Sequence, residues 1–92
     1  MDSVSAYIKI SGKVHGVFFR ATAKEIAEKN NLTGWVKNVS DGNVEVIVSG
    51  NKDNIEKFIE WCKDGPERAE VRNINVTYID EKMFKEFKVI RG

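Results

Sequence analysis

The spacing of hydrophobic residues changes several times along this chain, and the order of these changes constrains the fold more than any other feature. In some segments apolar residues alternate with polar ones, as in a strand with one buried face. In two others they recur every three or four residues, as in an amphipathic helix. The expected strands are residues 4–11, 34–38, 44–50, 69–79 and 85–92, and the expected helices lie within residues 20–31 and 51–66.

The second helix has the clearest boundaries. Asn51 can cap its first turn, and Gly65-Pro66 stops it. Its apolar stripe consists of Ile55, Phe58, Ile59 and Cys62. Because Cys62 belongs to this stripe, we expect it to be a core residue and not a nucleophile. Between the two helices, Asp41-Gly42 predicts a hairpin turn that joins two short strands.

This order of elements predicts the α+β class. The hairpin between the helices allows both of them to pack on one face of a single antiparallel sheet. The expected fold is the ferredoxin-like βαββαβ sandwich, an antiparallel sheet with two helices on one face. Since many activities occur on this fold, it does not by itself indicate a function.

The amino-acid composition indicates the class of protein and the partners that it is expected to lack. The 92 residues fit one domain, and 41% hydrophobic with 32% charged residues is typical of a globular protein. A net charge of +1 gives no strong attraction to nucleic acid or to a membrane surface. The single cysteine, Cys62, can form neither an intrachain disulfide nor a zinc site, which favours a reducing compartment. We therefore expect a cytoplasmic protein. A small domain without an obvious excess of apolar residues also suggests a monomer.

A glycine-bearing loop, GKVHGVFFR (residues 12–20), joins the first expected strand to the first helix. Backbone N–H groups at a helix start lack partners and carry the positive end of the dipole, and a glycine lets the loop curl around an anion. The positive charge of Arg20 is unfavourable near the positive end of the helix dipole, unless Arg20 binds an anion there. The alternative is a solvated arginine beside an ordinary turn. The loop has neither the Walker nor the G-x-G-x-x-G pattern.

Two blocks of sequence resemble the acylphosphatase family. GKVHGVFFR is similar to the family pattern G-x-V-Q-G-V-x-F-R, and GWVKNVSDGNVEV (residues 34–46) is similar to its G-W-V-x-N and D-G-x-V-E patterns. The later GPERAEV and FKVIRG segments are similar as well, so the resemblance covers Tyr7 to Arg91. It implies the ferredoxin-like fold, a single acylphosphatase-like domain over residues 1–92, and hydrolysis of acyl phosphates to carboxylate and inorganic phosphate.

The resemblance also implies roles for individual residues. Asn38 would orient the attacking water. It stands eighteen positions after Arg20, which matches the family spacing. No metal or cofactor is expected, since phosphoryl transfer to water with a carboxylate leaving group rests on positioning and charge stabilisation. The expected partners are a small acyl phosphate and inorganic phosphate as product and inhibitor, with no nucleic acid and no membrane. The phosphoryl group would be held by the loop residues His15, Gly16, Val17, Phe18, Phe19 and Arg20.

Several interpretations stay open. His15 stands where the family pattern has Gln, which suggests either a pH-dependent activity or a tolerated polar substitution. Asn38 has a structural alternative, as a turn residue at the end of its strand. An RNA-binding sheet is disfavoured, because the chain lacks the K/R-G-F/Y-G/A-F-V-x-F/Y motif and is nearly neutral. The main alternative function is a non-catalytic phosphate-binding or regulatory acylphosphatase-like domain.

Overall fold

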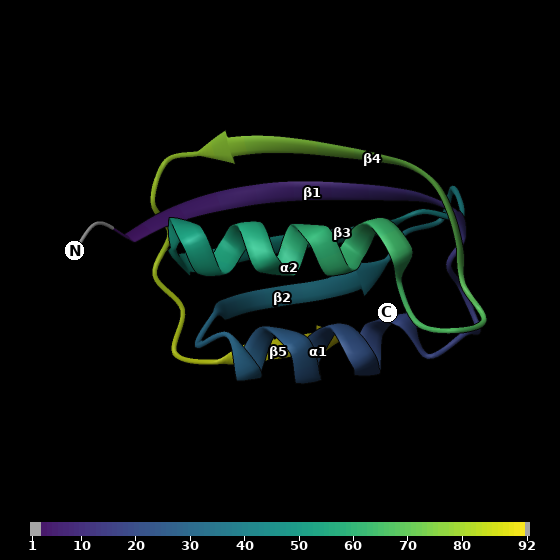
Figure 1. Ribbon diagram of the computed structural model, residues 1–92, viewed down its shortest axis with the longest axis horizontal. Coiled ribbons are helices and arrows are strands. Elements are labelled where there is room, and N and C mark those ends of the chain that lie inside the picture. Colours follow the sequence, from purple (N-terminus) through teal and green to yellow (C-terminus); the bar gives the residue numbers. More distant parts are fainter. Residues whose placement is uncertain (1–2, 92) are drawn as a thin grey trace.

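The computed structural model describes residues 3–91 and contains the predicted series of elements (Figure 1). Helix α1 ends earlier than expected, and Asn31 just after it has a left-handed backbone with φ of 57°. The last strand is shorter than the expected residues 85–92, of which residue 92 lies outside the described residues. The strands are β1 (Ser3–Lys13), β2 (Thr33–Asn38), β3 (Val44–Asn51), β4 (Glu70–Ile79) and β5 (Phe87–Ile90), and the helices are α1 (Phe19–Lys29) and α2 (Lys52–Asp64).

The five strands form one sheet in the order β4-β1-β3-β2-β5. The expected antiparallel pairing holds for β1 with β3 and β4, and for β2 with β3. It is wrong for β5, which runs parallel to β2, so the sheet is mixed. The reason is that β4 ends at the end of the sheet where β2 begins. The chain then crosses to the opposite edge, and a strand that starts there runs in the direction of β2 (Figure 1).

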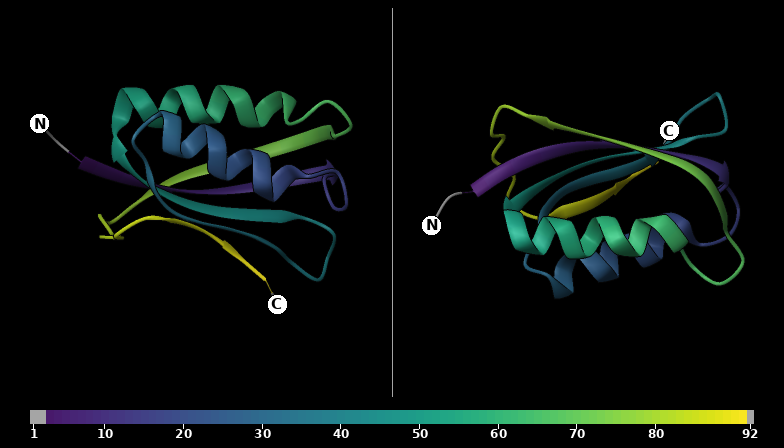
Figure 2. Two further views of the ribbon diagram at one scale, coloured as in Figure 1. Left: turned by 90° about the horizontal axis from the view of Figure 1, so that it is seen from below. Right: turned by 45° about the horizontal axis from the view of Figure 1, so that its top comes forward.

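Both helices cover the same face of the sheet, as predicted, and the hydrophobic core lies between these two layers (Figure 2). Alternate residues of the central strands meet the apolar stripes of the helices, and each fully buried large side chain stabilises the fold by about 1.5–3 kcal/mol. Cys62 is fully buried, so its prediction as a core residue is confirmed. Its neighbours in the core include Ile8, Ile10, Val44, Val46, Val48, Ile55 and Phe58.

The two helices begin in different ways. Helix α2 has the predicted cap, because the side chain of Asn51 accepts a hydrogen bond from the backbone N–H of Asp53 at 2.8 Å. Helix α1 has no side-chain cap and no acidic residue in its first turn, and its N-cap residue is Phe18. The positive end of the α1 dipole is therefore not neutralised by its own helix.

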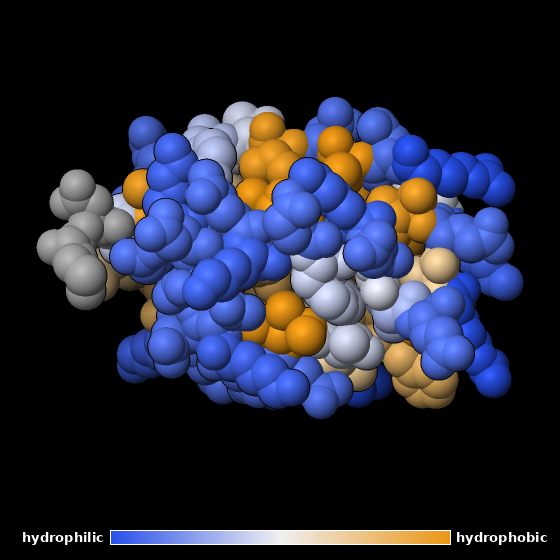
Figure 3. Space-filling model, in the orientation of Figure 1, coloured by the Kyte–Doolittle hydropathy of each residue, from blue (hydrophilic) through white to orange (hydrophobic). Residues whose placement is uncertain are grey.

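Hydrophilic residues dominate the face of the molecule shown in Figure 3, and apolar residues form separate patches among them. The exposed large apolar side chains include that of Phe18, which belongs to the loop before α1. Of the helices within residues 3–91, none has both the length and the apolar character that crossing a membrane requires.

Candidate active site

The loop between β1 and α1 alternates between left-handed and ordinary backbone conformations. Gly16 has φ of 69° and Phe18 has φ of 63°, whereas φ is not positive at Val17 or Phe19. Such alternation turns successive N–H groups toward one side and forms an anion-binding concavity. Phe18 adopts this conformation without the freedom of a glycine, at a cost of about 1–2 kcal/mol. A strained residue of this kind is typical of functional loops.

Apolar side chains hold this loop on the core. Val14, Val17 and Phe19 are 1%, 6% and 1% exposed. The ring of Phe19 packs against Trp61 of α2, with 5.2 Å between the ring centroids. Phe18 instead projects outward and is 75% exposed. With the apolar side chains directed to the core or to solvent, the backbone provides the polar groups of the loop.

The backbone N–H groups of residues 15–20 have no hydrogen-bond partner within the described residues. Within residues 3–91, none of these six groups donates a hydrogen bond to a backbone or side-chain acceptor. Part of this follows from helix geometry, which leaves the first N–H groups of α1 unpaired and partially positive. The loop adds further donors next to them. Together they suit a tetrahedral oxyanion.

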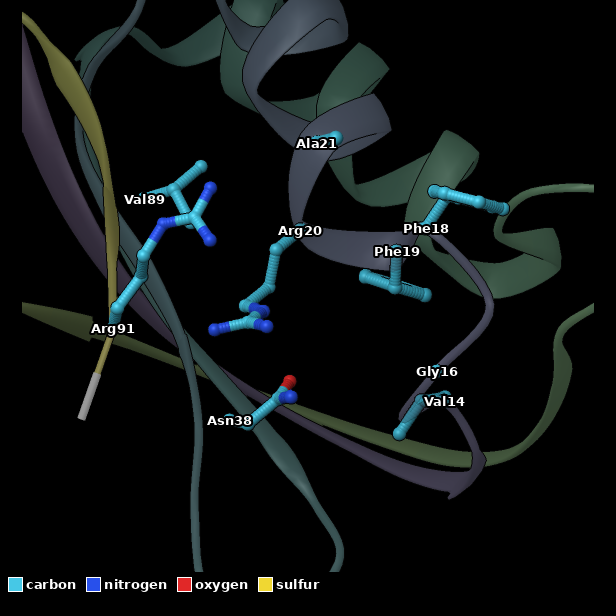
Figure 4. A pocket seen from close by; sticks show the side chains of 9 residues that line it. All are labelled: Val14, Gly16, Phe18, Phe19, Arg20, Ala21, Asn38, Val89 and Arg91. Atoms are coloured by element: carbon cyan, nitrogen blue, oxygen red, sulfur yellow. The ribbon is translucent and has the colours of Figure 1, made fainter.

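Arg20 directs its guanidinium into the cleft in front of this loop (Figure 4). Its Nη1 donates a long hydrogen bond of 3.4 Å to the carbonyl oxygen of Ile90 on β5. This contact steadies the side chain and leaves most of its five donors free for a ligand. Arg20 therefore adds a full positive charge and a planar pair of donors to the unpaired amides.

Asn38, the last residue of β2, points its carboxamide toward the guanidinium of Arg20 (Figure 4). Its Oδ1 is buried and has no hydrogen-bond partner within the described residues. A buried acceptor without a partner costs about 1–3 kcal/mol, and native structures contain few of them. An acceptor kept at this cost beside a cleft is a candidate for contact with a substrate or a water molecule.

One cleft of about 360 Å³ brings most of the predicted site together. This volume lies within the range of about 300–1,000 Å³ that is usual for small-molecule sites. Of the predicted residues, Gly16, Phe18, Phe19, Arg20 and Asn38 line it, whereas His15 and Val17 do not. None of its lining residues in the described chain is acidic. The other lining residues are Val14, Ala21, Val89 and Arg91.

Arg91 was not among the predicted site residues. It follows directly after β5, and its guanidinium approaches the cleft from the side opposite the loop (Figure 4). The parallel pairing of β5 with β2 places Arg91 near Asn38, and this pairing was not predicted. The cleft therefore holds two guanidinium groups and no carboxylate among its lining residues, a combination that favours anionic ligands.

His15 lies at the start of the loop and does not line the cleft. The imidazole Nε2 is 2.8 Å from the carbonyl oxygen of Asn43, in the turn between β2 and β3. Because a carbonyl oxygen can only accept, Nε2 carries the hydrogen. The side chain of His15 thus connects two loops, and only its backbone N–H can belong to the group of unpaired donors.

Comparisons with known proteins identify the family of this chain. The acylphosphatase family model matches residues 6–89. An acylphosphatase from Pyrobaculum aerophilum is 44% identical over 92 residues, which cover 98% of this chain and 97% of that protein. The structure of an acylphosphatase from Coxiella burnetii has a TM-score of 0.94 and 40% identity, and the match covers 97% of this chain and 94% of that one.

A structure of full-length HypF in its phosphate- and nucleotide-bound form is also similar, with a TM-score of 0.92 and 35% identity. That match covers 98% of this chain but 12% of the HypF chain, so the likeness is to one part of a longer protein. The acylphosphatases from Pyrobaculum aerophilum and Coxiella burnetii, by contrast, match over nearly their full length. These matches confirm the ferredoxin-like fold, and the chain therefore belongs to the acylphosphatase family of enzymes.

Proposed function

We propose that the cleft hydrolyses the carboxyl–phosphate bond of an acyl phosphate, releasing a carboxylate and inorganic phosphate. The loop N–H groups of residues 15–20 and the guanidinium of Arg20 hold the phosphoryl group, and Asn38 orients the attacking water. The observation that carries this proposal is the meeting of unpaired amides, a guanidinium and a buried carboxamide oxygen in one cleft. Membership of the acylphosphatase family supports acyl phosphates as the substrate class.

The phosphoryl group needs stabilisation more than it needs acid catalysis. A carboxylate is a good leaving group, so the departing oxygen requires no strong proton donor. In phosphoryl transfer the protein contributes mainly positioning and stabilisation of the charge on the equatorial oxygens. Backbone amides that are already oriented, together with a guanidinium, are well suited to this role because they need no reorganisation during the reaction.

Asn38 has the chemistry of a residue that orients water without deprotonating it. Its buried Oδ1 can accept a hydrogen bond from the attacking water, and an amide is too weak a base to take the proton. The water oxygen forms the new bond to phosphorus, and the phosphorus–oxygen bond to the acyl group breaks. The electron pair of that bond leaves with the carboxylate. A phosphoryl oxygen of the substrate takes the proton of the water.

The proposed reaction uses no metal ion. The positive charge comes from Arg20, from Arg91 at the opposite side of the cleft, and from the N-terminus of α1. Within residues 3–91, no group of three or more His, Cys, Asp or Glu side chains is placed to hold a metal ion. Activity that is unchanged after dialysis against EDTA would support this part of the proposal, and loss of activity restored by added Mg²⁺ would contradict it.

The direct test is hydrolysis of benzoyl phosphate, with inorganic phosphate added as a competitive inhibitor. We expect saturable turnover by the parent protein, and we expect phosphate to raise the apparent KM without changing kcat. Phosphate binding is measured separately by calorimetry. Turnover without inhibition by phosphate would contradict the proposed grip on the phosphoryl group.

A phosphate-binding domain without turnover is the second candidate function. What supports it is the likeness to one part of a much longer HypF chain, whose structure is a phosphate- and nucleotide-bound form. Such a domain would bind inorganic phosphate in the calorimeter and leave benzoyl phosphate intact. Binding together with turnover would exclude it.

We also propose that the enzyme is a cytoplasmic monomer that binds neither nucleic acid nor membranes. The single cysteine and the near-neutral net charge of +1 support this proposal. Sedimentation at micromolar concentration should give the mass of one chain, 10.5 kDa. A concentration-dependent increase in mass would contradict the monomer.

A further inference from the structure

The two halves of the cleft come from separate parts of the chain, and one side chain connects them. His15 is in the loop before α1, and its Nε2 donates to the carbonyl oxygen of Asn43 at 2.8 Å. The same carbonyl oxygen accepts the backbone N–H of Val39 at 2.9 Å. Val39 follows Asn38 directly. We propose that His15 is a positioning residue, which ties the loop of unpaired amides to the turn that sets the place of Asn38.

The turn that receives this hydrogen bond is internally braced. The carboxylate of Asp41 accepts from the backbone N–H of Asn43 at 3.1 Å and from its side-chain Nδ2 at 3.0 Å. The backbone hydrogen bond of Asn43 is the main cause of the lowered pKa of Asp41. Lys9 of β1 lies 3.7 Å from the same carboxylate. The Asn43 carbonyl is therefore a fixed acceptor, and a bond to it restrains whatever donates.

His15 can keep this bond in either protonation state. The neutral tautomer with hydrogen on Nε2 donates to the carbonyl, and the imidazolium does so as well. Glutamine, which the family pattern has at this position, carries an amide N–H₂ that can donate to the same acceptor. The requirement at position 15 is therefore a hydrogen-bond donor of suitable reach. The pH-dependent activity that the sequence suggested for this histidine stays a separate prediction.

The positioning role of His15 follows from the residues that are adjacent in sequence to the two ends of this hydrogen bond. His15 is bonded to Gly16 of the amide group, and Val39 is bonded to Asn38. When the hydrogen bond is lost, the amides keep their own anchors on the core, but the carboxamide of Asn38 is less restricted relative to them. This inference rests on the proposed function, because it assigns to Asn38 the orientation of the attacking water. Turnover should then suffer more than phosphate binding.

The test compares His15→Gln with His15→Met. The two substituted side chains are similar in length and uncharged, and only glutamine can donate a hydrogen bond. We expect His15→Met to lower kcat for benzoyl phosphate about five- to tenfold, the usual worth of one hydrogen bond, with an unchanged phosphate dissociation constant. His15→Gln should restore kcat to within about twofold of the parent. Equal kcat in both variants and the parent would overturn the proposal, and so would a His15→Met variant that loses phosphate affinity in proportion.

Nuclear magnetic resonance tests the same bond without turnover. His15 is the one histidine of the sequence, so its imidazole nitrogen signals are unambiguous. These signals should show that the Nε2 atom of His15 carries a hydrogen. The side-chain N–H₂ signals of Asn38 should shift and broaden in His15→Met but not in His15→Gln. If the parent fails to hydrolyse benzoyl phosphate and the Asn38 signals still respond in this way, the proposed function fails and the positioning role stands. Unresponsive Asn38 signals in an active enzyme would overturn the positioning role alone.

Discussion

Arg20 and Asn38 face each other across one cleft although eighteen positions separate them in the sequence (Figure 4). The first turn of α1 carries the guanidinium, and the last residue of β2 carries the carboxamide. Arg20 brings charge and donors, and Asn38 brings a buried acceptor without a partner. Because the two side chains have different chemistry, we expect their removal to have different effects on phosphate binding and on turnover.

Replacing Arg20 should remove the strongest interaction with the phosphoryl group. We expect Arg20→Ala to lower kcat/KM for benzoyl phosphate at least a hundredfold, or about 3 kcal/mol, by analogy with the loss of an oxyanion donor. Inhibition by phosphate should weaken in parallel. Arg20→Lys keeps the charge but loses the planar pair of donors, so it should recover only part of the activity. Arg72→Ala, on the exposed side of the edge strand β4, is the matched control and should resemble the parent.

Replacing Asn38 should separate turnover from binding. We expect Asn38→Ala to lower kcat about tenfold or more while the inhibition constant of phosphate stays within about twofold, since the amide loop and Arg20 remain. The free energy of unfolding should not fall, because the variant removes a buried acceptor without a partner. Chemical denaturation measures this. Asn75→Ala, at an exposed position of β4, is the control. A variant that loses phosphate affinity as strongly as turnover would contradict the assigned role.

The sequence predicts those parts of the site that depend on local geometry. The loop before α1 and the end of β2 each carry a recognisable pattern, and hydrophobic spacing locates the elements that hold them. The position of β5 depends instead on where the chain crosses the sheet after β4, which no local pattern specifies. For that reason Arg91 was missed. The hydrogen bond from His15 to Asn43 joins a side chain to a backbone carbonyl 28 positions away. Neither residue type predicts such a long-range hydrogen bond.

Arg91 should contribute mainly through its charge. We expect Arg91→Ala to raise KM for benzoyl phosphate about three- to tenfold at low ionic strength, with a smaller effect on kcat. The effect should shrink as salt is added, because Arg91 is exposed and exposed charges are screened. Arg91→Lys should stay close to the parent. The measurement is KM at two ionic strengths. An Arg91→Ala variant that lowers kcat and leaves KM unchanged would place Arg91 in contact with the transition state instead.

Gly16 should be needed for its backbone conformation and not for space. A Cβ at this position meets nothing within 4 Å, so the cost of Gly16→Ala comes from its φ of 69°. We expect Gly16→Ala to lose about 1 kcal/mol in the free energy of unfolding, and we expect its loop to relax and bind phosphate less tightly. Gly42→Ala is the matched control, since Gly42 also has positive φ and open space. It should lose similar stability and keep its phosphate affinity. Equal phosphate affinity in both variants would contradict the amide site.

Cys62 should make the protein less stable in alkaline solution. Burial raises the pKa of the folded thiol well above its ordinary value of 9.0. Above pH 9.0 the thiol therefore ionises in the unfolded chain before it does so in the folded one, and this favours unfolding. We expect the free energy of unfolding to fall there by up to about 1.4 kcal/mol per pH unit. Burial, together with the hydrogen bond to Glu45, also raises the pKa of Tyr7 to about 12, which adds a second decline above its ordinary value of 10.0.

Urea denaturation from pH 7 to 11 distinguishes the two groups. Cys62→Ala should be less stable than the parent at neutral pH, because it leaves a small gap in the core. Its stability should then stay level until Tyr7 begins to ionise in the unfolded chain. Tyr7→Phe should keep the first decline and lose the second. If the parent and Cys62→Ala curves run parallel between pH 9 and 10, the thiol is not the source of the first decline, and its burial has no effect on alkaline stability.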